Sequence, residues 1–213
     1  LATKGDPVGV QRQEPVLIRC LRIPFSTNVE RVALAAGHKG VPIEWVDVDE
    51  DDRSPVEEVS GQPLVPVLVA GDEVVSDSPR ILDWLEDRFP EPSLLPREPA
   101  RRAEVRVFAD WFNRVWKTFP NGINDGVGDA AAHTAEMHLA VTLFESLLAG
   151  RDFFFGDFGL ADVTAFPFLK YASLGLSRGD EDSFHTVLAE QVPLDADSPL
   201  HAWVARVDAL PRS

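Results

Sequence analysis

The fold is decided by the stretch Leu64-Val65-Pro66-Val67-Leu68-Val69 and by Val74-Val75-Ser76-Asp77-Ser78, which follows it after a Gly71-Asp72 turn. Two apolar runs around a glycine turn predict a β-hairpin, and Asp77 and Ser78 predict the start of a helix. Proline is unusual at the entry of a strand, because it lacks the N–H that a central ladder needs. A cis Val65–Pro66 peptide bond would turn the backbone of Val65 outward, where an extended peptide-like ligand can pair with it. The segment therefore predicts a peptide-binding edge beside a carboxylate, a hydroxyl and helix amides.

Length and composition indicate a globular protein with two cores. The chain has 213 residues, of which 45% are apolar and 26% charged. Its formal net charge of −15 excludes nucleic acids and anionic membranes as partners, since both require basic patches. No apolar run reaches the length of about 18 residues that a membrane span needs. Acidic residues cluster at 47–52 and 179–182, where solvated loops are expected.

Cysteine usage points to a reducing compartment. The single cysteine, Cys20, excludes an internal disulfide framework and predicts a cytoplasmic location. Cys20 lies in a strand-like run and is expected to be a buried, inert thiol. Residues 1–15 are polar and irregular, and they lack the apolar core of a signal peptide. We expect them to form an irregular N-terminal extension.

The order of predicted elements divides the remainder into an α/β domain and an all-helical domain. Strands are expected at 16–21 and 43–48, besides the hairpin, and helices at 28–38, 55–59 and 77–89. Three prolines between residues 90 and 96 cannot continue a helix, so this segment is the expected linker between domains 16–89 and 97–213. Beyond it the apolar period is helical throughout. The expected helices lie at 97–119, 130–149, 160–174, 183–192 and 200–209.

The loop after the first strand carries the best candidate for catalysis. Thr27 and Glu30 have the spacing of a capping box, which predicts that Thr27 caps the following helix. Ser26 would then precede the cap with its hydroxyl free near the positive helix end, where it can stabilise a thiolate. Lowering the pKa of a thiol by two units requires roughly 2.7 kcal/mol of preferential thiolate stabilisation, which a hydroxyl and a helix terminus can supply. The alternative is that Ser26, Thr27 and Asn28 only terminate and cap.

Several motifs together resemble the glutathione transferase family. The run Ser26-Thr27-Asn28-Val29-Glu30-Arg31-Val32 is similar to the start of the first helix in serine-type members, the phi- and theta-like and many bacterial forms. Val65-Pro66 resembles the family's cis-proline, and Asp77-Ser78 resembles its Glu-Ser pair. Residues 156–162 resemble the capping motif before its sixth helix. The resemblance implies a thioredoxin-like N-terminal domain followed by an all-helical domain.

The resemblance also implies roles for individual residues. Ser26 would hydrogen-bond the glutathione sulfur, and Asn28 would help hold the loop. Val65, preceding Pro66, would pair with the cysteinyl backbone, while Asp77 and Ser78 would hold the γ-glutamyl end. Arg53 stands in the region whose basic residues meet the glycyl carboxylate. The tyrosine type is disfavoured because the only tyrosine is Tyr171, and the cysteine type because this turn holds no cysteine.

Three positions depart from the family pattern. Leu64 stands where Gln or Lys commonly bonds the ligand backbone, and Gln62 replaces it only if the loop is reshaped. Arg53 is the single cation among six acids between residues 49 and 58. Gly159 stands where Ser or Thr caps a helix, which is expected to lower stability by about a few tenths of a kcal/mol. We therefore expect weak glutathione binding, or preference for another small thiol.

An acceptor pocket is expected between the domains. The family lines it partly with the first helix of the second domain, which here carries Trp111, Phe112, Val115 and Trp116. Most of these aromatic side chains are expected in the core between helices, and one or two of them could face the pocket. His133 and His138 are five residues apart and do not share a helical face, so no metal site is expected. The resemblance further implies a cytoplasmic homodimer with a role in detoxification.

The function predicted from sequence is conjugation of glutathione, or a related thiol, to a small apolar electrophile. Thiol-dependent isomerisation, reductive dehalogenation and ether cleavage use the same thiolate and stay open. So does a transferase-like fold kept as a non-catalytic binding module. No metal or bound redox cofactor is implied.

Overall fold

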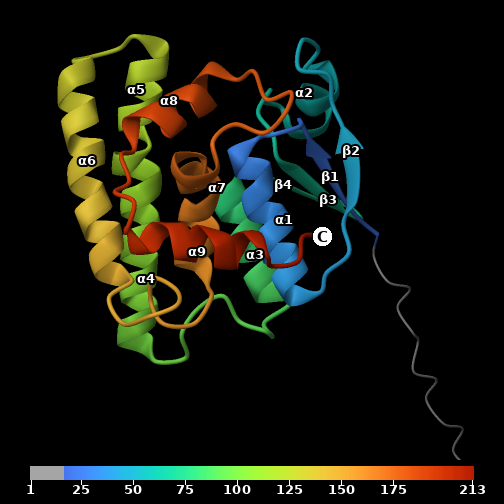
Figure 1. Cartoon of the computed structure of the whole chain (residues 1–213). Coiled ribbons are helices and arrows are strands. Elements are labelled where there is room, and N and C mark those ends of the chain that lie inside the picture. The colour runs from blue at the N-terminus through green and yellow to red at the C-terminus, as the bar shows by residue number, and fades with distance from the viewer. Residues whose placement is uncertain (1–16) are drawn as a thin grey trace, which may run out of the picture.

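The computed structural model describes residues 17–213, and the expected extension at 1–15 lies outside them (Figure 1). The first domain is built on a four-stranded sheet of order β2-β1-β3-β4. β1 pairs in parallel with β2 and antiparallel with β3, and β3 and β4 form the hairpin predicted around Gly71. The strands are β1 (Ile18–Arg22), β2 (Glu44–Asp47), β3 (Val67–Ala70) and β4 (Glu73–Ser76).

Alternate residues of the strands pack on opposite faces of the sheet, as the two-residue period of a strand requires. Ile18, Cys20 and Leu68 join the large core with α1 (Thr27–Lys39) and α3 (Ser78–Arg88). Leu21 and Val67 pack on the other face with Val56 of α2 (Ser54–Ser60). Burial raises the pKa of the Cys20 thiol to about 12, so Cys20 is the inert core residue that was expected.

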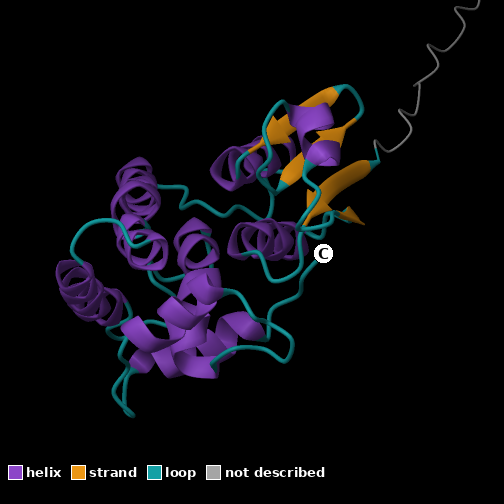
Figure 2. Cartoon of the chain, turned by 90° about the horizontal axis from the view of Figure 1, so that it is seen from above, coloured by secondary structure: helices purple, strands orange, loops and turns teal. Residues whose placement is uncertain are grey.

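The second domain is entirely helical, and it lies to one side of the sheet (Figure 2). α7 is its central helix, since residues 161–169 are all buried and α7 contacts α1 of the first domain. The fold class expected from the sequence, a thioredoxin-like domain followed by an all-helical domain, is confirmed. The helical elements are α4 (Pro99–Trp111), η1 (Phe112–Trp116), α5 (Thr118–Asp125), α6 (Ala130–Leu147), α7 (Leu160–Leu174), α8 (Ser183–Gln191) and α9 (Pro199–Asp208).

The helix expected at 97–119 is interrupted, which is a correction. After α4 the chain forms one π-helical turn, η1, in which the Lys117 N–H donates to the Phe112 carbonyl five residues earlier at 3.0 Å. The wider turn changes the direction in which the following side chains point, and such turns are frequent at functional sites. Apolar periodicity does not reveal it. Asn113 and Lys117, which come from this segment, both reach the first domain.

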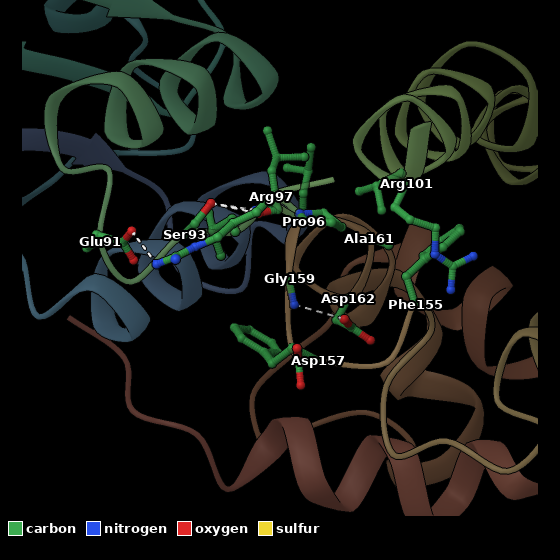
Figure 3. A pocket seen from close by; sticks show the side chains of 15 residues that line it. Glu91, Ser93, Pro96, Arg97, Arg101, Phe155, Asp157, Gly159, Ala161 and Asp162 are labelled. Atoms are coloured by element: carbon green, nitrogen blue, oxygen red, sulfur yellow. Dashed lines mark hydrogen bonds and ion pairs between the residues drawn. The ribbon is translucent and has the colours of Figure 1, made fainter. Parts of the chain in front are cut away.

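The linker is held against the start of α7 by a close backbone contact. The Leu160 N–H donates to the Leu94 carbonyl at 2.7 Å, and a Cβ atom on Gly159 would lie 2.6 Å from that oxygen. A side chain at position 159 would clash with this carbonyl, so glycine is required there. This differs from the expectation that Gly159 is only a tolerated helix cap. Figure 3 shows Gly159 and Asp162 beside linker residues Ser93 and Pro96, around a cavity of about 350 Å³.

Asp162 ties three segments of the helical domain together. Its carboxylate accepts hydrogen bonds from the Phe154 N–H at 3.1 Å, the Gly159 N–H at 3.1 Å and the Trp203 indole N–H at 2.8 Å. Burial raises the pKa of Asp162 to about 6, and these three donors oppose the shift. The carboxylate is therefore a structural acceptor, as the resemblance to the capping motif implied.

We expect Asp162→Ala to lower the free energy of unfolding by about 3 kcal/mol, because it leaves three buried donors without an acceptor. Urea denaturation measures this change. Asp157→Ala is the matched control, since Asp157 is exposed and lies in the loop just before α7. Equal stability of the two variants would contradict the structural role of Asp162.

Candidate active site

Two adjoining hollows contain the residues that the resemblance placed at the ligand. The larger, which we call the large cleft, has a volume of about 760 Å³ and is lined by Ser26, Arg53 and Val65, with residues 179–185 opposite. The smaller, which we call the small pocket, has a volume of about 300 Å³ and is lined by Asn28, Val65, Asp77, Ser78 and Lys117. Val65 borders both hollows, and Pro66 is buried next to it. The structure thus brings these residues together.

Ser26 itself caps α1, so the capping box predicted for Thr27 is wrong. The Ser26 hydroxyl accepts a hydrogen bond from the Val29 N–H at 3.5 Å, and Thr27 is the buried first residue of the helix. Glu30 does not reach back, because its carboxylate pairs with Lys170 at 2.6 Å and Arg212 at 3.3 Å. A hydroxyl that accepts from an amide keeps its own proton to donate. Ser26 therefore faces the large cleft with a donor at a helix N-terminus.

The Val65–Pro66 peptide bond is cis, as predicted. Val65 lies before the ladder, since β3 begins at Val67. The Gln62 side chain braces this loop: its amide accepts from the Leu64 N–H at 2.7 Å and donates to the Leu64 carbonyl at 2.9 Å. Gln62 is therefore occupied in positioning Leu64, whose own side chain is exposed.

Asp77 and the start of α3 border the small pocket. Asp77 adopts φ +76°, which is rare for a residue other than glycine and is typical of functional sites. Within the described chain the Asp77 side chain caps none of the α3 amides. Ser78 is buried, and its hydroxyl donates to Asn28 and accepts from Arg31, both at 3.3 Å. A ligand at this end would therefore meet the Asp77 carboxylate and the helix amides before the Ser78 hydroxyl.

Arg31 lies under the small pocket and is completely buried. Its guanidinium donates to the Thr164 carbonyl of α7 at 2.8 and 2.9 Å and to Asn113 of η1 at 2.9 Å. It also donates to Asn28 at 3.2 Å and stands 4.6 Å from the ring centre of Phe168. Burial lowers the pKa of Arg31 to about 9, an effect that Asp77 opposes. Arg31 therefore joins the two domains at the site.

Lys117 is a site residue that sequence reasoning missed. Its ammonium donates to the Asn28 side-chain oxygen at 3.3 Å and lines the small pocket. Burial is the main reason that its pKa falls to about 8, and repulsion from Arg31 adds to the effect while Asp77 opposes it. Lys117 is distant in sequence and depends on η1 for its position, so no local motif identifies it.

The aromatic residues expected to line the acceptor pocket lie elsewhere. Phe112 and Trp116 are fully buried and stacked on each other, with ring centres 4.4 Å apart, so they belong to the helical core and that expectation is corrected. Trp111 packs on Phe108 and Phe144, and Val115 is exposed. None of the four is among the residues lining the large cleft within the described chain.

The wall opposite Ser26 is formed by the acidic loop before α8, which the sequence indicated only as a solvated run. Asp180 is buried and accepts a hydrogen bond from the His185 imidazole at 2.8 Å, and His185 stacks on Tyr171. Glu181 and Asp182 are exposed at the rim, together with Glu50. The cleft therefore has an acidic rim in which Arg53 is the cation. Among residues 17–213, no His, Cys, Asp or Glu side chains form a group of three suited to a metal ion, and no helix is long and apolar enough to cross a bilayer.

The lowered pKa of Lys117 makes stability depend on pH. Between pH 8 and 10.5 the unfolded chain holds this proton and the folded chain does not, so the free energy of unfolding rises with pH by up to about 3 kcal/mol. Lys117→Met removes this contribution. Urea denaturation at pH 7 and at pH 10.5 measures the effect. Relative to Lys117→Met, the free energy of unfolding of wild type should be higher at pH 10.5 than at pH 7. A difference independent of pH would contradict the burial of a charged Lys117.

Comparison with known proteins agrees with this geometry. A family model described as the N-terminal domain of glutathione S-transferase matches residues 21–93. A probable glutathione S-transferase from Nicotiana tabacum is 30% identical over 152 residues, which cover 70% of this chain and 68% of the relative. A maleylpyruvate isomerase from Ralstonia sp is 37% identical over 88 residues, covering 39% of this chain and 42% of the isomerase.

A solved structure extends the likeness to both domains. The rice glutathione S-transferase 1 in complex with glutathione is 25% identical and has a TM-score of 0.72, covering 93% of this chain and 89% of the rice chain. One conclusion follows from the N-terminal match, from the relative that aligns over most of its length and from the shared two-domain fold. This chain belongs to the glutathione S-transferase family.

Proposed function

We propose that this protein transfers glutathione to a small electrophile. The observation that carries the proposal is the Ser26 hydroxyl at the N-terminus of α1, in the same cleft as Val65. In the reaction the thiol loses its proton to water and the thiolate sulfur attacks an electrophilic carbon. A carbon–sulfur bond forms, and the displaced electron pair leaves with the leaving group or moves onto an activating group of the acceptor.

Ser26 supplies the stabilisation that a thiolate needs. Its oxygen already accepts the Val29 N–H, so its proton is available to the ligand sulfur. A hydrogen bond to an ionised group contributes roughly 1.5–3 kcal/mol, and a helix N-terminus adds about 0.3–1 kcal/mol. Together these cover the roughly 2.7 kcal/mol that lowers a thiol pKa by two units.

The two hollows suit the two ends of an extended tripeptide. With the cysteinyl residue along Val65, the sulfur points to Ser26 and the γ-glutamyl end enters the small pocket. There the ligand ammonium meets Asp77, and its carboxylate meets the α3 amides. The glycyl carboxylate lies toward Arg53, whose Nε also donates to the Glu50 carbonyl at 2.8 Å. An extended tripeptide such as glutathione can reach both hollows, whereas a smaller thiol would leave one of them unfilled.

The acidic rim favours a neutral or cationic acceptor. Glu50, Glu181 and Asp182 line the large cleft beside the sulfur position, so an anionic electrophile would be repelled. The apolar part of the acceptor site also differs from the expectation, because the phenylalanines that line the large cleft are Phe25 and the α8 residue Phe184 rather than residues of α4 and η1.

Thiol-dependent isomerisation is the second candidate, and the likeness of the N-terminal half to a maleylpyruvate isomerase supports it. Maleylpyruvate carries carboxylates, which the acidic rim would repel. Conjugation is therefore the better-supported activity. We further propose a cytoplasmic homodimer with a role in detoxification, which rests on family resemblance and on cysteine usage.

Ser26→Ala should lower kcat/KM for a model aryl halide at least tenfold, a barrier change of roughly 1.4 kcal/mol or more, while glutathione affinity changes less. Because Ser26 also caps α1, the alanine variant should lose about 1 kcal/mol of stability. Ser26→Asp separates the two roles: it caps α1 but offers no proton and repels a thiolate. We expect Ser26→Asp to keep wild-type stability and lose activity. Full activity in Ser26→Asp would assign the thiolate to backbone amides instead.

A further inference from the structure

Two buried cations, Lys39 and Arg31, have different kinds of hydrogen-bond partner. The Lys39 ammonium lies 2.7 Å from the Glu86 carboxylate, which is the usual arrangement. Arg31 is equally enclosed, yet its hydrogen bonds all end on neutral oxygens, those of Thr164, Asn28, Asn113 and Ser78. A buried cation without an anion is unfavourable unless something else supplies the negative charge.

Lys117 doubles this unbalanced charge. Arg31 and Lys117 share one neutral acceptor, the Asn28 side-chain oxygen, at 3.2 and 3.3 Å. Among residues 17–213 neither forms an ion pair within 4.0 Å. Asp77, the carboxylate that acts on both, is exposed at the pocket rim. The site therefore holds two adjacent cations that no carboxylate of residues 17–213 pairs with.

The small pocket is the place where an anion can reach this pair. Lys117 lines it directly, whereas Arg31 lies beneath it. An ammonium has three donors, and Asn28 takes one of them. The Ser78 hydroxyl already donates to Asn28, so Lys117 is the charged side chain of this pocket with N–H groups left for an anionic ligand. The N-terminus of α3, where Ser78 lines the same pocket, favours the same charge.

We propose that Lys117 binds the α-carboxylate at the γ-glutamyl end of glutathione, which thereby becomes the counter-ion of the Arg31–Lys117 pair. This inference rests on the proposed function. It assigns recognition of the co-substrate to a residue of the helical domain, so ligand binding spans both domains. It also provides a strong contact at the end of the ligand away from the acids around Arg53.

The test compares glutathione with 4-aminobutanoyl-cysteinylglycine, which differs only by lacking the α-carboxylate. Calorimetry should show that wild type binds the analogue about ten- to a hundredfold more weakly. In Lys117→Met, glutathione affinity should fall by a similar factor, and the two ligands should bind within about twofold of each other. Lys117→Arg should restore most of the preference. Without ligand, Lys117→Met should melt no lower than wild type at pH 7, because it removes an unpaired buried charge.

Arg114→Met is the matched control, because Arg114 is an exposed cation of η1 paired with Asp110. It should bind both ligands like wild type. Tight glutathione binding by Lys117→Met, or an unchanged preference, would overturn the inference. If wild type binds no glutathione, the proposed function fails, and glutarate is then the probe. A thermal shift by glutarate in wild type but not in Lys117→Met would still support the anion site, and no shift would refute it.

Discussion

One buried guanidinium holds the site together. Arg31 leaves α1 of the first domain and donates to Thr164 of α7 and Asn113 of η1 in the second. It also contacts Asn28 and Ser78, which border the small pocket. The hydrogen bonds that join the domains therefore also fix the ligand-binding residues. A change in domain packing would alter the small pocket directly, so stability and binding are linked in this chain through Arg31.

The small pocket and the large cleft differ in the charge of the residues around them. The small pocket is lined by Lys117 and lies over the buried Arg31, so it suits the anionic end of a peptide. Ser26 stands in the large cleft next to Val65, which borders both hollows. The acids on the far rim favour an acceptor that is not anionic. Part of the net charge of −15 therefore lies at the site, where Glu50, Glu181 and Asp182 line the large cleft. The cations Arg31 and Lys117 lie at the small pocket instead.

Local sequence signals predicted the first domain well and the second less completely. The Val65–Pro66 cis bond, the hairpin and the position of α7 followed from short-range rules, because turn chemistry and apolar period act over a few residues. The cap at Ser26 was missed because Ser26 and Thr27 are equally suited to it, and tertiary packing buried Thr27. Lys117 was missed because its position depends on η1. The sequence placed most of the aromatic residues in the helical core but could not say which of them face a pocket, because the burial of Phe112 and Trp116 depends on contacts between distant helices. Gly159 was predicted to be only a tolerated helix cap, whereas the nearby Leu94 carbonyl leaves no room for a larger residue there.

The central claim is that glutathione lies across both hollows with its sulfur ionised at Ser26. The most direct measurement is the ultraviolet absorbance of the thiolate of bound glutathione as a function of pH, with the Cys20→Ser variant so that only the ligand contributes. A free thiol has a pKa of about 8.5, and we expect that of the bound thiol to lie roughly two units lower. A bound thiol that titrates like free glutathione would contradict the account.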